Sequence, residues 1–288
     1  MADLLTHLLN GVILGLLYAV IALGFMLILG TMEVINFSHG VLFAFGGYLA
    51  LTLQPRVGWW AALVLAPLAV GALGLGLELG LRRTYGRDPL FGLLFTFGAA
   101  LALEELIRII WGPQGQTVAA PAFLAGPFHL GFLFYSKYRL LVGSLAVLLL
   151  AVVWLFLERT PYGAIIKAGA YDSDMVRALG IDLGRVRMLV FGLGAALAGV
   201  AGVVAAPMWG LKPTVGTEAV MPAFIVVVVG GIGSFWGSVL GGLMLGVASG
   251  LSNLVVPRGS ILVMYLLMTV VLLVRPRGLF GQKSVLEA

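Results

Sequence analysis

The 288-residue sequence contains no cysteine and only three histidines. Without cysteine, disulfides and thiolate metal sites are excluded. His7, His39 and His129 do not follow a metal-ligand spacing. The sequence also lacks the His-Glu-x-x-His, Gly-x-Ser-x-Gly and Gly-x-x-x-x-Gly-Lys-Ser/Thr patterns, which argues against a zinc protease, a serine hydrolase and a self-contained ATPase. We therefore expect no catalytic residue, no metal site and no cofactor.

Charged residues are scarce as well, at 10% of the chain, whereas hydrophobic residues make up 61% and the mean hydropathy is +1.11. A water-soluble domain of this composition would aggregate, so the sequence predicts an integral membrane protein. The net charge of +5 comes from basic residues concentrated in loops, as orientation in a membrane requires. We expect no nucleic-acid partner.

Apolar segments of roughly the length that a helix needs to cross a bilayer recur along the chain. They lie near residues 8–30, 40–54, 59–80, 90–111, 138–157, 187–206, 218–230, 235–256 and 260–274. The pattern predicts an all-α integral membrane protein, a polytopic helical bundle of about 8–10 transmembrane segments in a single domain over residues 1–288. Segments 40–54 and 218–230 are short and bordered by Gly, Pro or Asn, which indicates half-helices or broken spans.

Many of the 41 glycines fall within the apolar segments. Pairs spaced four residues apart allow helix backbones to approach closely in lipid. Such pairs are Gly11/Gly15, Gly76/Gly80, Gly237/Gly241 and Gly242/Gly246. We interpret them as packing residues and expect a compact bundle.

Lysine and arginine in the short loops predict the orientation. One set of loops carries Arg82, Arg83, Arg87, Arg159, Lys167, Arg177, Arg185, Arg187, Arg275, Arg277 and Lys283; the other carries Arg56, Arg108, Lys137, Arg139, Lys212 and Arg258. The richer set is expected in the cytoplasm, with the C-terminus inside and the N-terminus outside. The first apolar segment lacks a basic leader and a cleavage site, so we expect it to be a retained span.

The longest loop on the outer side runs from about Gly112 to Lys137 and carries Phe128, Phe132, Phe134 and Tyr135 near its end. We expect a small hairpin that rests on the outer surface. Its aromatic residues suit an interfacial belt, or a contact surface for an external partner.

Residues 160–185 form a polar segment between long apolar runs. Thr160-Pro161 is a helix-start signal, Ala164–Leu179 is predicted to be a helix interrupted by Gly169, Gly180 is the expected C-cap, and Asp182 the cap of the next helix. With apolar residues and both charge signs, the segment suggests a docking element for a soluble partner. An interfacial helix lying against lipid headgroups is the alternative.

Several motifs together resemble one family. They are Gly15–Gly30, Val34-Ile-Asn-Phe-Ser-His-Gly40, 163–187 with 191–202, 229–242, and Arg275-Pro-Arg-Gly-Leu-Phe-Gly281. In this order they resemble branched-chain amino acid ABC transporter permeases of the LivH type, over essentially the whole chain. Val41 stands where the family often carries an acidic residue, so the resemblance leaves urea, short amides and aromatic acids open as solutes beside branched-chain amino acids.

The resemblance implies a permease subunit in the bacterial cytoplasmic (inner) membrane. Its partners would be a second, different permease subunit, two cytoplasmic ATP-binding-cassette ATPase subunits, which hydrolyse the ATP, and an external solute-binding protein. It assigns residues 160–185 to ATPase coupling. The docking residues would be Lys167, Asp172, Asp174, Met175, Arg177, Leu179 and Gly180, with Gly180 as the turn.

Polar residues within apolar segments are candidates for a translocation path, because burial in hydrocarbon is costly. Asn36, Ser38 and His39 lie at a break between two apolar segments. They either line a water-filled cavity or form a connecting turn at the cytoplasmic face, as Glu33 close by would suggest. Thr96 is a further candidate.

Glu104 and Arg108 are spaced to form an i,i+4 pair. Glu105 lies about 100° around the helix from Glu104 and is expected to point elsewhere, toward a partner or the path.

Three other classes of protein compete with the permease. An ion-coupled secondary transporter should carry charged residues near the middle of its spans, of which this chain has almost none. A membrane-embedded enzyme needs paired carboxylates or histidines at mid-membrane depth, and these are lacking too. A structural membrane subunit would not explain the charged segment 160–185.

Overall fold

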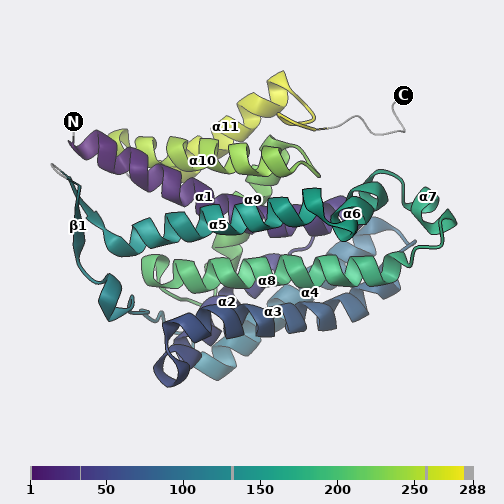
Figure 1. The fold of residues 1–288 in the computed structure, drawn as a ribbon, viewed down its shortest axis with the longest axis horizontal. Coiled ribbons are helices and arrows are strands. Elements are labelled where there is room, and N and C mark those ends of the chain that lie inside the picture. The colour runs from purple at the N-terminus through teal and green to yellow at the C-terminus, as the bar shows by residue number, and fades with distance from the viewer. Residues whose placement is uncertain (1, 33, 131–132, 257–258, 282–288) are drawn as a thin grey trace.

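The computed structural model describes residues 2–32, 34–130, 133–256 and 259–281. Each of the nine predicted apolar segments forms one helix (Figure 1). These helices are α1 (Ala2–Met32), α2 (Ser38–Val57), α3 (Trp59–Leu81), α4 (Pro89–Trp111), α5 (Lys137–Arg159), α8 (Leu183–Trp209), α9 (Val215–Gly230), α10 (Phe235–Val255) and α11 (Ser260–Val274). The all-α membrane bundle predicted from the sequence is confirmed.

Six of these helices are long and apolar enough to cross a membrane, namely α1, α3, α4, α5, α8 and α10. Helices α9 and α11 have only 16 and 15 residues, about 24 Å at 1.5 Å per residue, against a hydrocarbon core of about 30 Å. Helix α2 begins deep inside the bundle, because His39 in its first turn contacts the carbonyl of Ile21, a residue well before the end of α1. The chain therefore turns back between α1 and α2. Of the two segments predicted to be short or broken, 218–230 forms the short helix α9, whereas 40–54 forms a helix of 20 residues, α2, that begins inside the bundle.

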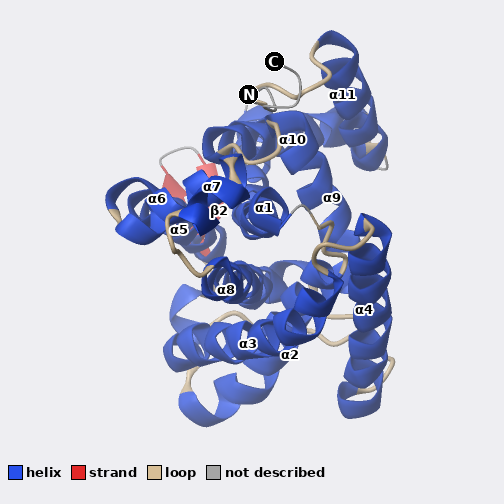
Figure 2. Cartoon of the chain, turned by 90° about the vertical axis from the view of Figure 1, so that its right-hand side faces the viewer, coloured by secondary structure: helices blue, strands red, loops and turns tan. Residues whose placement is uncertain are grey.

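Helix α1 occupies the middle of the bundle (Figure 2). It packs between α10 on one side and α8 on the other, and α8 packs in turn on α2 and α3. Helix α4 lies at the edge against α2, with Gly92, Thr96 and Ile107 as its buried residues. Helices α1 and α8 therefore make most of the contacts that form the core.

Glycine allows the closest of these contacts. A Cβ on Gly11 would lie 2.8 Å from the carbonyl oxygen of Gly246, and one on Gly15 would lie 2.7 Å from that of Gly242. The backbones of α1 and α10 therefore touch directly, as these two glycine pairs predicted. The pair Gly76/Gly80 does not serve this purpose: Gly76 has no atom within 4 Å of a Cβ position.

The helix boundaries follow signals that are visible in the sequence. Asp88 accepts a hydrogen bond from the Leu90 amide at 2.9 Å and precedes Pro89, the first residue of α4. Ser136 and Ser234 cap α5 and α10 in the same way. A side-chain cap satisfies one of the free amides at a helix start, which explains why these helices begin where they do.

The hairpin predicted in the long loop between Gly112 and Lys137 is present. Strand β1 (Pro127–Leu130) pairs with antiparallel β2 (Leu133–Ser136) beside the first turns of α1; Phe132 lies outside the described residues. Tyr135 and Arg139 donate hydrogen bonds to the side-chain oxygen of Asn10 at 2.7 and 2.6 Å. We call this end of the bundle the hairpin end, and the opposite end, which carries α6 and α7, the α6–α7 end (Figure 1).

We predict that Gly15→Leu destabilises the bundle, because a side chain there would force α1 and α10 apart. Overpacking of this kind costs about 1–3 kcal/mol, and the midpoint of thermal unfolding in detergent should fall. Gly76→Leu is the matched control, since its position is open. Equal midpoints for the two variants would contradict the direct backbone contact.

Candidate functional site

The polar segment 160–185 folds as two short helices at the α6–α7 end. Helix α6 (Pro161–Tyr171) begins at Thr160, whose hydroxyl accepts a hydrogen bond from the Gly163 amide at 3.1 Å. Helix α7 (Ser173–Ala178) begins at Asp172. The prediction of one helix over Ala164–Leu179, interrupted at Gly169, was wrong in detail: the break is at Asp172, because its carboxylate accepts hydrogen bonds from the amides of Asp174 and Met175 and caps a new helix.

Gly180 and Asp182 have the local roles that the sequence predicted. Gly180 follows α7 with φ of +79°, in the left-handed region that glycine adopts without steric cost. Asp182 accepts hydrogen bonds from the Gly184 and Arg185 amides and so starts α8. The two residues turn the chain from the polar segment back into the bundle.

The predicted docking residues are not all free for a partner. Asp172 acts as a helix cap, and Lys167 forms an ion pair with Glu158 at 2.9 Å. Asp174 and Arg177 lie 3.4 Å apart and are exposed. Met175 is 61% exposed and Leu179 72%, and Tyr171 is exposed too. Helix α7 therefore presents apolar side chains beside a pair of opposite charges.

A second group of polar residues lies inside the bundle, where the chain turns back between α1 and α2. Asn36, Ser38, His39 and Thr96 are each at most 1% exposed. Glu33 lies outside the described residues. Their burial shows that the connection between α1 and α2 is not a surface turn, and a role of residues 36–39 in a translocation path stays a prediction.

Thr96 of α4 connects to this interrupted backbone. Its hydroxyl accepts a hydrogen bond from the Phe37 amide at 3.3 Å and lies 3.0 Å from the Ile35 carbonyl oxygen. Asn36 accepts from both the amide and the hydroxyl of Ser38, at 3.0 and 2.5 Å. Backbone groups that are free in the membrane interior are costly, so these side chains make the break possible.

His39 connects α2 to α1. Its Nε2–H donates to the Ile21 carbonyl oxygen at 3.0 Å, because a carbonyl only accepts. Its Nδ1 and the amide nitrogen of Asn36 are buried without a hydrogen-bond partner among the described residues. One buried donor and one buried acceptor therefore have no partner within the described part of the chain.

Helices α2 and α9 meet beside this group. A Cβ on Gly40 of α2 would clash with the Gly216 carbonyl of α9, and it would lie 2.9 Å from the Cβ of Val220. The beginnings of α2 and α9 thus cross in direct contact inside the bundle.

The charged residues near the other end of α4 form a separate cluster. Arg108 pairs with Glu104 at 2.6 Å, as predicted, and also with Glu105 at 3.0 Å. The expectation that Glu105 points elsewhere was wrong, since the i,i+3 spacing brings it to the same guanidinium. Thr217 of α9 donates to Glu104 at 3.4 Å. Glu105 is nine residues beyond Thr96, about 13 Å along the helix, so it does not join the buried group.

Sequence reasoning missed a third group, at the α6–α7 end. Glu78 of α3 is only 1% exposed, and Arg187 of α8 lies over the ring of Tyr85 at 4.9 Å. The Tyr85 hydroxyl donates to the sulfur of Met32 at 3.1 Å. Burial, followed by the negative charge of Glu78, raises the pKa of Tyr85 well above its usual value. A lone acid inside an apolar run was the signal that could have revealed this group.

In the described part of the chain, no three His, Asp or Glu side chains come together in a way that could hold a metal ion. The arrangement offers exposed docking residues and buried polar groups along interrupted helices. Together with the six membrane-length helices, these features define a polytopic membrane protein.

The comparisons with known proteins give the family. The family model described as branched-chain amino acid transport system / permease component matches residues 7–272, so the chain belongs to this family and is a transport subunit. It is 31% identical to the high-affinity branched-chain amino acid transport system permease protein BraD of Pseudomonas aeruginosa, over 98% of this chain and 97% of BraD. Its identity to the permease protein LivH of Escherichia coli is also 31%, over 98% and 96%.

A second type of permease is similar as well. The high-affinity branched-chain amino acid transport system permease protein LivM of Escherichia coli is 27% identical over 92% of this chain and 68% of LivM. A solved structure of PsaBC from Streptococcus pneumoniae in complex with Fab covers 96% of this chain at 14% identity with a TM-score of 0.49, too low to carry a comparison.

We predict that Thr96→Val lowers the free energy of unfolding by about 1–3 kcal/mol, because the Phe37 amide then loses its partner in a buried place. Thr96→Ser keeps the hydroxyl and should stay close to the wild type. Thermal unfolding in detergent measures both. A valine variant as stable as the serine variant would show that the hydroxyl does not hold the break.

Proposed function

We propose that the chain is a membrane permease subunit of an ATP-binding-cassette importer for branched-chain, hydrophobic amino acids. The family description and the names of BraD and LivH support the solute. The exposed apolar face of α7, outside the membrane-length helices, is the observation that carries the coupling to a soluble ATPase.

The α6–α7 end faces the cytoplasm in this proposal. The basic residues of the described chain gather there: Arg82, Arg83, Arg87, Arg159, Lys167, Arg177, Arg185, Arg187, Arg275 and Arg277. The hairpin end has Arg56, Arg108, Lys137, Arg139 and Lys212. Loops rich in Lys and Arg remain on the inner side, which favours a C-terminus inside and an N-terminus outside a bacterial inner membrane; Arg258 and Lys283 lie outside the described residues.

The complex would contain two permeases, two cytoplasmic ATPase subunits and an external binding protein. LivH and LivM of Escherichia coli carry the name of the same transport system. This chain is more similar to LivH than to LivM, which supports a different chain of the LivM type as its partner. Hydrolysis of ATP belongs to the ATPase subunits, since this sequence has no phosphate-binding loop.

Segment 160–185 is the coupling segment of the single permease domain. Closure of the ATPases would push on Met175, Leu179, Asp174 and Arg177, and the capped helices would transmit the force as rigid units. The bundle would then rock between outward-open and inward-open states. In the translocation path, the Asn36 side-chain amide would donate a hydrogen bond to the solute and the His39 Nδ1 would accept one. Ser38 and Thr96 would stabilise the interrupted backbone through their hydrogen bonds. Glu105 remains a candidate at the outer entrance of the path.

Purification of the tagged chain in mild detergent from its native membrane tests the assembly. Mass spectrometry should find two ATPase subunits and a second permease in the same particle. A chain that arrives alone, and moves solute in liposomes without ATP, would instead favour a secondary transporter.

We predict that Leu179→Glu abolishes docking, because a carboxylate would replace an apolar contact without disturbing the fold of an exposed position. Solute-stimulated ATPase activity of the reconstituted complex should fall about tenfold or more, the loss typical of a buried interface residue. Arg83→Glu is the control, since it adds negative charge at the same end but outside the coupling segment. An unchanged Leu179→Glu complex would contradict the docking role of α7.

A further inference from the structure

Glu78 has an unusual environment for a carboxylate. It lies one turn before the end of α3 and is only 1% exposed. Neither carboxylate oxygen accepts a hydrogen bond from the described part of the protein. A buried charge without a partner is costly, so an ionised Glu78 would need a cation within reach.

Two arginines are close enough to act electrostatically on Glu78, namely Arg82 and Arg187. Arg82 follows directly after α3, and its backbone amide bonds to the Glu78 carbonyl. A pair between these two would remain within one turn of the same element. Arg187 instead belongs to the start of α8, five residues after Asp182, which caps α8 and lies in the coupling segment.

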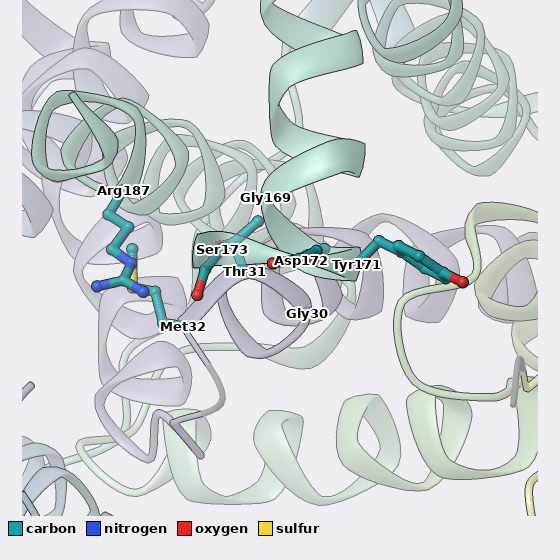
Figure 3. A pocket seen from close by; sticks show the side chains of 9 residues that line it. Gly30, Thr31, Met32, Gly169, Tyr171, Asp172, Ser173 and Arg187 are labelled. Carbon is teal, nitrogen blue, oxygen red and sulfur yellow. The ribbon is translucent and has the colours of Figure 1, made fainter. Parts of the chain in front are cut away.

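Arg187 has space to move. It lines a cavity of about 340 Å³ between the end of α1 (Gly30–Met32) and the junction of α6 with α7 (Gly169–Ser173) (Figure 3). It also lines a cavity of about 510 Å³ with Tyr85 and residues 180–184. Its side chain points toward Met32 in the close view. The start of α8 is therefore loosely packed against α1 and the α3–α4 connection, unlike the middle of the bundle.

We propose that Glu78 is the second binding position of the Arg187 side chain. In the conformation described here, Arg187 rests on Tyr85 and Glu78 is unpaired. When the ATPases displace the coupling segment, the first turn of α8 moves with it, and Arg187 leaves Tyr85 and pairs with Glu78. The pair then ties α8 to α3, so that the two long helices move as one body. This inference rests on the proposed importer function, and it makes Glu78 and Arg187 positioning residues for the coupling.

The test uses the reconstituted complex and measures the solute transported per ATP hydrolysed. Glu78→Gln and Arg187→Gln should each lower this ratio about fivefold or more, the lower end of typical coupling energies. The double variant should be no worse than the worse single variant, because both remove the same pair. Arg187→Lys keeps the charge and should retain most of the coupling, and Arg83→Gln, an exposed neighbour, is the control.

Several outcomes would overturn the pair. A silent Glu78→Gln would mean that the buried acid is neutral and needs no cation. Additive losses would mean that the two residues act separately, and a loss in Arg82→Gln equal to that in Glu78→Gln would assign the partner to Arg82. Uptake and ATPase activity that are both absent in the wild-type complex would refute the importer function itself, which is a different result.

A second measurement follows the motion directly, should Glu78→Gln assemble poorly. The chain has no cysteine, so Met32→Cys with Ser173→Cys places a unique pair across the smaller cavity. The rate of disulfide formation should change between the nucleotide-free complex and the complex held closed with ATP and vanadate. Equal rates in an active complex would show that the coupling segment does not move relative to α1, and would overturn the proposal.

Discussion

The contact between the backbones of α1 and α10 is the constraint on which the rest of the structure depends. Hydrocarbon gives no hydrophobic force to bring helices together, so close van der Waals contact has to do so. Gly11 and Gly15 of α1 meet Gly246 and Gly242 of α10 at distances that no side chain would allow. On its other side, α1 meets α8 through Gly24 and Gly194. Because α1 is fixed in this way, α8 is fixed against it, and α2 and α3 pack on α8.

The interrupted backbone near residues 34–37 depends on this frame. A chain that turns back inside a membrane protein leaves amides and carbonyls without helical partners. Here Thr96 and Asn36 supply hydrogen bonds, and His39 bonds to a carbonyl of α1. The same polar side chains that permit the break leave one donor and one acceptor free. A structural requirement and a candidate solute contact thus come from the same few residues.

Periodicity and capping residues were enough to predict the helices. Nine apolar segments became nine helices of the described chain, and Thr160, Gly180 and Asp182 took the places expected of them. The break at Asp172 was not predicted, because an aspartate within a helix pattern becomes a cap only if the chain bends there. The partners of Thr96 and Glu78 lie on other helices, and a single sequence does not contain that information. Arg108 shows the same limit. Its spacing allows an ion pair with Glu104 and with Glu105, and the sequence analysis predicted only the pair with Glu104.

The hydrogen bonds around Asn10 have a mechanical consequence. One amide oxygen near the start of α1 accepts from both Tyr135 and Arg139, so the starts of α1 and α5 are held together at the hairpin end. At the opposite end, α5 continues directly into α6 through Thr160. Helix α5 is about 35 Å long, 23 residues at 1.5 Å each, and is fixed at one end by the hydrogen bonds to Asn10. A small displacement of α6 would rotate α5 about that point, and the end of α5 near the hairpin would stay in place.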